Sequence, residues 1–150
     1  MVTLDIGLLR TWLNYERQLT GFLTLNSEIG IDGELGKNYY LFVPTLRIEP
    51  RYYYSFNKRV TKNKRTINNS ANFISVMVLH YSDLFELSNR DNSSLTPSTS
   101  VLAKWGLRRS ISEQFDFEFA TGVFLSTTES PSEQPLVYYL LIDVRVGYVF

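Results

Sequence analysis

Apolar residues recur at every second position near the C-terminus of the chain. Within residues 136–150 (LVYYLLIDVRVGYVF), one set of alternate positions is apolar or aromatic: Leu140, Ile142, Val144, Val146, Tyr148 and Phe150. The intervening set contains Leu141, Asp143, Arg145, Gly147 and Val149. Side chains of a β-strand point alternately to its two faces, so the pattern predicts a strand with one apolar and one charged face. The apolar face is long enough to cross a thin bilayer, because a tilted membrane strand needs about 9–11 residues.

Six further segments have strand-like patterns. They are residues 4–16, 22–32, 39–57, 72–81, 101–109 and 115–125. The alternation in the first of them changes phase between Leu8 and Leu9, which we interpret as a β-bulge near Gly7. Pro44 and Pro50 each lack a backbone donor, so they predict bulges or a locally broken ladder in the longest segment.

Two features of these segments bear on orientation and fold class. Residues 72–81 are apolar on both faces, and we expect Ile74, Val76 and Val78 to point outward. No segment has an apolar stripe with a period of 3.6 residues, so no helix is predicted. The chain is therefore expected to be a single all-β domain over residues 1–150.

The number of predicted strands conflicts with the simplest closed architecture. Seven strands are evident, whereas bacterial single-chain membrane barrels have an even number. We therefore predict an antiparallel up-and-down transmembrane β-barrel of eight strands, with one strand missing before Val2. With only seven strands, the N-terminus would lie on the extracellular side.

The segments between the predicted strands are of two kinds. Residues 17–21 and 110–114 form short turns, whereas residues 33–38, 87–100 and 126–135 form longer polar loops. The longer loops are expected on the extracellular side. A basic loop over 57–70 contains five Lys and Arg residues and no acid, and it is expected on the periplasmic side.

Composition excludes several other classes of protein. Acids and bases balance at 15 each, so net charge does not point to nucleic acid. The chain has no cysteine, which excludes a disulfide framework and a thiolate metal site. No run of about 18 apolar residues exists, so a transmembrane helix is excluded. The start of the chain does not read as a signal peptide, because Asp5 interrupts its apolar residues. Either a signal has been removed, or the protein stays in the cytoplasm.

Several segments together resemble a group of small outer-membrane β-barrel proteins of the Bacteroidota. They are LRIEPRYYYSFNKR (46–59), NNSANFISV (68–76), KWGLRRSI (104–111), FDFEFATGVF (115–124) and the C-terminal strand. The resemblance covers roughly residues 5–150 and implies a barrel in the bacterial outer membrane, in contact with outer-membrane lipids and lipopolysaccharide. It also implies that the barrel-assembly machinery recognises the C-terminal strand. It brings no catalytic residues.

Two sets of residues follow from this orientation. The charged faces are expected to form an ion-pair network in the lumen: Arg10, Glu28, Asp32, Arg47, Glu49, Arg51, Lys104, Arg108, Asp116, Glu118, Asp143 and Arg145. Aromatic residues at strand ends are expected to form a membrane girdle: Tyr52, Tyr54, Phe56, Trp105, Tyr148 and Phe150. A soluble lipocalin-like barrel, with its apolar face inward around a ligand, is the alternative arrangement.

Candidate chemistry is sparse. His80 and Ser82 lie two residues apart, so on a strand they would share a face and the imidazole could activate the hydroxyl. This spacing resembles the catalytic pair of outer-membrane lipid A deacylases, but here Asp83 follows and no orienting acid is identified. No metal-binding cluster or phosphate-binding loop appears, so neither metal nor cofactor is expected. The prediction is a barrel with a structural, binding or accessory role, with a possible envelope protein partner and no nucleic acid, and an esterase is the alternative.

Overall fold

A computed structural model describes residues 1–89, 97–127 and 140–150 of the chain. Nine strands belong to one antiparallel sheet. They are β1 (Val2–Gly7), β2 (Arg10–Gln18), β3 (Leu23–Leu35), β4 (Tyr40–Tyr52), β5 (Asn72–Tyr81), β6 (Leu87–Ser88), β7 (Ser98–Ser110), β8 (Phe115–Thr127) and β9 (Leu140–Val149). Two short helical segments, α1 (Phe56–Val60) and η1 (Ile67–Asn69), lie between β4 and β5.

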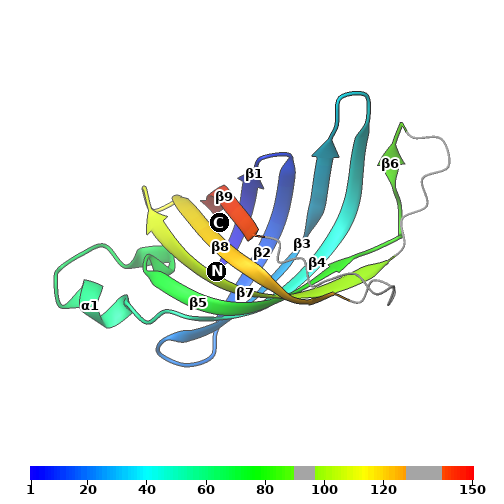
Figure 1. Cartoon of the computed structure of the whole chain (residues 1–150). Coiled ribbons are helices and arrows are strands. Elements are labelled where there is room, and N and C mark those ends of the chain that lie inside the picture. Colours follow the sequence, from blue (N-terminus) through cyan, green and yellow to red (C-terminus); the bar gives the residue numbers. More distant parts are fainter. Residues whose placement is uncertain (90–96, 128–139) are drawn as a thin grey trace.

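Eight of the strands close into a barrel, and the ninth, β6, is an extra strand on β4. Each of the eight barrel strands pairs with the next barrel strand in sequence, so that β5 pairs with β7, and β1 pairs with β9 to close the barrel. The termini therefore lie together, and the backbone N–H of Phe150 donates to the carbonyl of Val2 at 3.1 Å. Figure 1 shows the curved sheet, with α1 projecting at one side and β6 at the other. The predicted all-β antiparallel barrel of eight strands is confirmed.

The eighth strand of the barrel is β1, at the start of the chain. Residues 4–16 do not form one bulged strand, because β1 and β2 pair as a hairpin in which Gly7 faces Arg10. Leu8 and Leu9 form the turn, and Leu9 has a left-handed backbone with φ of 58°. The phase change therefore marks a turn, and the prediction that an eighth strand is missing before Val2 was wrong. An even strand number also places the N-terminus at the same end as the C-terminus, not at the opposite end as seven strands required.

Pro50 breaks one ladder of β4 locally, as predicted. On the β3 side, β4 pairs without interruption from Tyr40 to Tyr52. On the β5 side, the pairing skips Glu49 and Pro50 and resumes at Arg51 in the same register. The missing donor of proline thus costs a ladder bond without shifting the strand.

The connections differ in detail from the prediction. The basic loop contains α1 and η1, although no helix was predicted, because a helix of five residues is too short to show a periodic stripe. β3 and β7 extend into the residues predicted as loops at 33–38 and 87–100. The short turns at residues 17–21 and 110–114 lie at the same end as the termini. Part of the predicted loop at 126–135 falls outside the described residues.

Alternation along each strand sorts the side chains into two environments. The set that points out of the barrel is apolar and exposed, as with Ile29 (58% exposed), Ile48 (54%) and Ile142 (60%). Ile74, Val76 and Val78 belong to this set, as predicted. The set that points inward is mostly polar or charged and buried. The fold therefore has a charged interior and an apolar exterior, the reverse of a lipocalin-like barrel.

Candidate functional site

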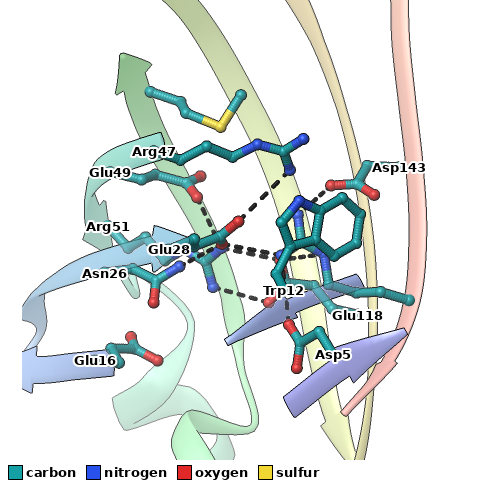
Figure 2. Close-up of polar contacts among 12 residues, drawn as sticks. Asp5, Trp12, Glu16, Asn26, Glu28, Arg47, Glu49, Arg51, Glu118 and Asp143 are labelled. Atoms are coloured by element: carbon teal, nitrogen blue, oxygen red, sulfur yellow. Dashed lines mark hydrogen bonds and ion pairs between the residues drawn. The ribbon is translucent and has the colours of Figure 1, made fainter. Parts of the chain in front are cut away.

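The interior of the barrel collects charged side chains from every strand except β5 and β6. The buried acids are Asp5, Glu16, Glu28, Asp32, Glu49, Asp116, Glu118 and Asp143, and the buried bases are Arg47, Arg51, Lys104, Arg108 and Arg145. Figure 2 shows how several of these side chains converge from strands on different sides of the lumen. An isolated charge is very costly to bury, so the pairing of these groups decides whether the interior is stable.

Glu118 is the centre of a first cluster. Its carboxylate accepts two hydrogen bonds from Arg51, at 2.8 and 3.0 Å, and two from Arg108, at 2.7 and 3.0 Å. Arg51 also donates to Glu49 at 2.7 Å, and Arg108 donates to Glu16 at 2.5 Å. Because β5 and β7 separate β4 from β8, the bond from Arg51 to Glu118 spans the lumen.

Arg145 organises a second cluster. It lies on β9 and donates to Glu28 at 2.9 Å and Asp5 at 3.3 Å, and it also bonds Asp143 on its own strand. Glu28 lies on β3, with β1 and β2 between it and β9. This cluster therefore connects the two sides of the barrel that flank the termini.

Trp12 fills the space between these guanidinium groups. The side chain is fully buried, and its indole N–H donates to Asp32 at 3.0 Å. The guanidinium carbons of Arg47 and Arg145 each lie 4.5 Å from the centroid of the indole, a distance typical of cation–π contacts. Arg47 also donates to Asp32 at 2.6 Å. One aromatic residue thus contacts two cations and one acid.

A glycine makes room for this indole. A Cβ atom at Gly30 would lie 2.3 Å from the carbonyl oxygen of Thr11 and 2.4 Å from Cδ1 of Trp12. Gly30 therefore occupies a position at which the lumen has no space for a side chain.

Lys104 and Glu49 form a third contact of the network. They lie 3.1 Å apart, and the Ser75 hydroxyl donates to the same carboxylate oxygen at 2.5 Å. On its other side Lys104 contacts the sulfur of Met77 at 3.8 Å. Met77, Leu79 and Leu102 form a buried apolar cluster on the same two strands, β5 and β7, as Ser75 and Lys104.

Tyr53 lies where the charged interior meets the end of the barrel near the termini. Its side chain packs with Ala71, Phe73 and Ala120, and its hydroxyl donates to Glu16 at 2.9 Å. Burial raises the pKa of the Tyr53 phenol well above its ordinary value, so this hydroxyl keeps its proton as a donor. Phe56 packs against the same cluster.

The predicted lumen residues are brought together with one partial exception. All of them are buried except Arg10, whose side chain is 30% exposed and lies 3.9 Å from Asp32. Asp5 was missed, because the misassigned bulge in residues 4–16 left its face undefined. The alternation of β1 from Val2 to Gly7 would have placed it inward.

The predicted girdle residues lie on the outer face, again with one exception. Tyr52, Tyr54, Trp105, Tyr148 and Phe150 are exposed, between 37% and 73%. The indole N–H of Trp105 donates to the Tyr54 hydroxyl at 2.8 Å. Phe56 is the exception, because β4 ends at Tyr52 and Phe56 starts α1, where it turns toward the Tyr53 cluster.

His80 and Ser82 make separate contacts. The His80 Nδ1 lies 2.9 Å from the Thr99 hydroxyl on the outer face of β5 and β7. Ser82 follows the end of β5 and is buried, and its hydroxyl accepts the backbone N–H of Leu84 at 3.3 Å. Within the described residues, no hydrogen bond joins the imidazole to this hydroxyl.

The described residues contain no cluster of three or more His, Cys, Asp or Glu side chains that could hold a metal ion. Within the same residues, no helix is long and apolar enough to cross a membrane. The residues of the lumen form a network of paired charges around Trp12.

A scan against protein-family models finds no match to this chain, and a search of curated proteins finds no relative.

Proposed function

We propose that this protein is a small β-barrel of the bacterial outer membrane, with a structural, binding or accessory role in the envelope. The observation that carries the proposal is the apolar outer face. Among the described strand positions, that face has only two Lys, Arg, Asp or Glu residues, Arg17 and Arg109. Both lie in the last residues of their strands, at the end near the termini.

A lipid environment accounts for this distribution. Exposed apolar patches larger than a few hundred Å² are rare on soluble monomers and mark surfaces that contact a membrane or a partner. Here the exposed apolar residues occur on all eight barrel strands, from Ile6 on β1 to Val146 on β9, so they surround the barrel. A closed barrel also satisfies its backbone hydrogen bonds without water, as the bilayer core requires.

The charged interior supports a closed lumen rather than a pore. A barrel of eight strands has an interior just wide enough for side chains. Trp12, Arg51, Arg108 and Arg145 are all less than 2% exposed, so they occupy this volume. Ion pairs across the lumen would then act as a plug that rigidifies the barrel.

Orientation and partners follow from the same proposal. The C-terminal strand β9 would be recognised by the barrel-assembly machinery, and the termini and the basic loop would then lie on the periplasmic side. The hairpin β3–β4 and β6 would then face outward, toward lipopolysaccharide. An envelope protein partner would bind at one of these two ends.

Solubility and secondary structure test the proposal. The purified protein should remain monodisperse only in detergent or lipid, and its circular dichroism should be that of a β protein. A stable monomer in plain buffer would contradict the membrane assignment.

A further inference from the structure

The outer face of the barrel carries an apolar groove. A groove of about 710 Å³ lies across β4, β5, β7 and β8, and its walls include Pro50, Tyr52, Val76, Trp105 and Val123. Ala103 lies in the middle, because it pairs with Val76 on one side and with Val123 on the other. A small side chain between larger ones produces the hollow, and its lining is almost wholly apolar.

A chain of polar contacts leads from this groove to the end of the barrel near the termini. Trp105, in the groove wall, donates to the Tyr54 hydroxyl at 2.8 Å. The same hydroxyl accepts a hydrogen bond from the side-chain amide nitrogen of Asn72 at 3.4 Å. The side-chain oxygen of Asn72 in turn accepts a hydrogen bond from the guanidinium of Arg109 at 2.5 Å. Aromatic hydroxyls and indoles prefer the boundary between lipid chains and water, so this contact chain marks the level of lipid headgroups.

The basic loop approaches Arg109 through Arg65, which contacts Ile111, and we call the cations of the loop together with Arg109 the basic cluster. It comprises Lys58, Arg59, Lys62, Lys64, Arg65 and Arg109. Arg59 is linked to the end of β7 that carries Arg109, because its guanidinium donates to the carbonyl of Arg65 at 2.8 Å and Arg65 contacts Ile111. The loop is held against the turn between β7 and β8, because Arg65 donates to the carbonyl of Ile111 at 3.0 Å and Asn68 donates to that of Glu113 at 2.9 Å. In the described part of the chain, no member of the basic cluster forms a salt bridge with an acid.

We infer that the groove and the basic cluster together bind one anionic phospholipid, with an acyl chain in the groove and the phosphate at Arg59 and Arg109. The inference rests on the proposed membrane location and adds a specific lipid site to it. An acyl chain matches the apolar lining, and a phosphate matches the cations that lack an acid partner.

A second copy of the chain fits this surface less well. Copies inserted in the same orientation would bring two basic clusters to the same level of the membrane, and the members of these clusters form no salt bridge among the described residues. Like charges at close range repel, so the same feature that attracts a phospholipid disfavours a dimer here.

Trp105 provides the probe, because it lies in the groove wall and the chain has only one other tryptophan. Trp12→Phe protein would be reconstituted in phosphatidylcholine vesicles that contain either a brominated phosphatidylglycerol or a brominated phosphatidylcholine. Bromine on the acyl chain quenches a tryptophan that it contacts. We expect the anionic lipid to reach half-quenching at a mole fraction lower by at least roughly fivefold, because each Lys or Arg near the membrane surface contributes a factor of about five to anionic lipid binding.

Variants separate the two parts of the site. Arg59→Gln with Arg109→Gln should reduce the preference to near onefold, and Ala103→Phe should reduce it by filling the groove. The triple variant Lys58→Gln, Lys62→Gln and Lys64→Gln should also reduce the preference for the anionic lipid. It should not affect folding, because these side chains make no hydrogen bond or ion pair among the described residues. Arg17→Gln is the matched control, because Arg17 is an exposed base on the outer face of β2, outside the groove. It should keep the full preference.

The outcomes distinguish this inference from the proposed function. Equal quenching by both lipids would leave the barrel in the bilayer and overturn the lipid site. If aqueous acrylamide quenches Trp105 and neither brominated lipid does, the membrane location itself is overturned. Trp105 shielded from both lipids and from acrylamide would mean that a protein surface covers the groove, which also overturns the lipid site.

Discussion

Arg145 on β9 donates a hydrogen bond of 2.9 Å to Glu28 on β3, across a lumen in which β1 and β2 separate these strands. The contact joins residues 117 positions apart in sequence. Such bonds form only when the barrel has closed, so they stabilise the closed sheet. They also make each buried charge depend on partners from distant strands.

Removal of the central acid should therefore destabilise the whole barrel. Glu118→Leu would remove the carboxylate that Arg51 and Arg108 share and leave each arginine with one fewer acid partner, and removal of one partner of a buried ion pair costs about 3–5 kcal/mol. Glu113→Leu makes the same change at an exposed turn position and should alter stability by no more than about 0.5 kcal/mol. Denaturant unfolding in micelles measures both. Equal stabilities would mean that the charged face does not form a closed interior.

Strand periodicity predicted much of this site, because a period of two assigns each charge to a face. For β9 it placed Asp143 and Arg145 inward and Val144 and Val146 outward, as the structure has them. Periodicity does not identify partners, however. The pairing of Arg145 with Glu28 depends on the register of every strand around the barrel, and no local pattern specifies that register.

The first hairpin shows a different limit of sequence patterns. Tight turns are usually recognised by Gly, Asn, Asp or Pro, but here Leu8 and Leu9 form the turn. Leu9 adopts a left-handed backbone that leucine rarely adopts, and its carbonyl accepts the N–H of Gly33 at 2.9 Å. Tertiary contacts thus hold a turn that lacks turn residues. The phase change between the two leucines was its only signal.

Space in the lumen should be as limiting as charge. Gly30→Ala would place a methyl group within 2.4 Å of Trp12 and 2.3 Å of a backbone oxygen, so we expect a loss of about 1–3 kcal/mol from overpacking. Gly21→Ala is the matched control, because a Cβ there would meet no heavy atom within 4 Å. Thermal unfolding in the same detergent measures the difference. If the two variants have the same melting temperature, the indole of Trp12 is not held against Gly30.

A filled lumen should not conduct ions. Protein inserted in a planar bilayer should give no current steps above the leak of the bilayer, because Trp12 and three arginines occupy the interior. Steady single-channel conductance from the wild-type protein would contradict the plug. Protein with Glu118→Leu tests the link between pairing and closure, and it should show more frequent transient openings.

The pair His80 and Ser82 should have no hydrolytic role. Their contacts run to Thr99 and to the backbone of Leu84, so the imidazole is not placed to accept the Ser82 proton. Wild-type protein in mixed micelles with lipopolysaccharide should release no fatty acid above the blank. Release that is abolished by both His80→Ala and Ser82→Ala would instead establish an esterase.

The central claim is that the charged face is inside the barrel and the apolar face is in lipid, and two tryptophans test it most directly. Trp12 is fully buried in the lumen, and Trp105 is 37% exposed on the outer face. Trp12→Phe protein reports on the outer face alone, and Trp105→Phe protein reports on the lumen alone. In vesicles of brominated phosphatidylcholine, we predict strong quenching of Trp105 and little quenching of Trp12, with neither readily quenched by aqueous acrylamide. Quenching of Trp105 by acrylamide and not by the brominated lipid would contradict the account.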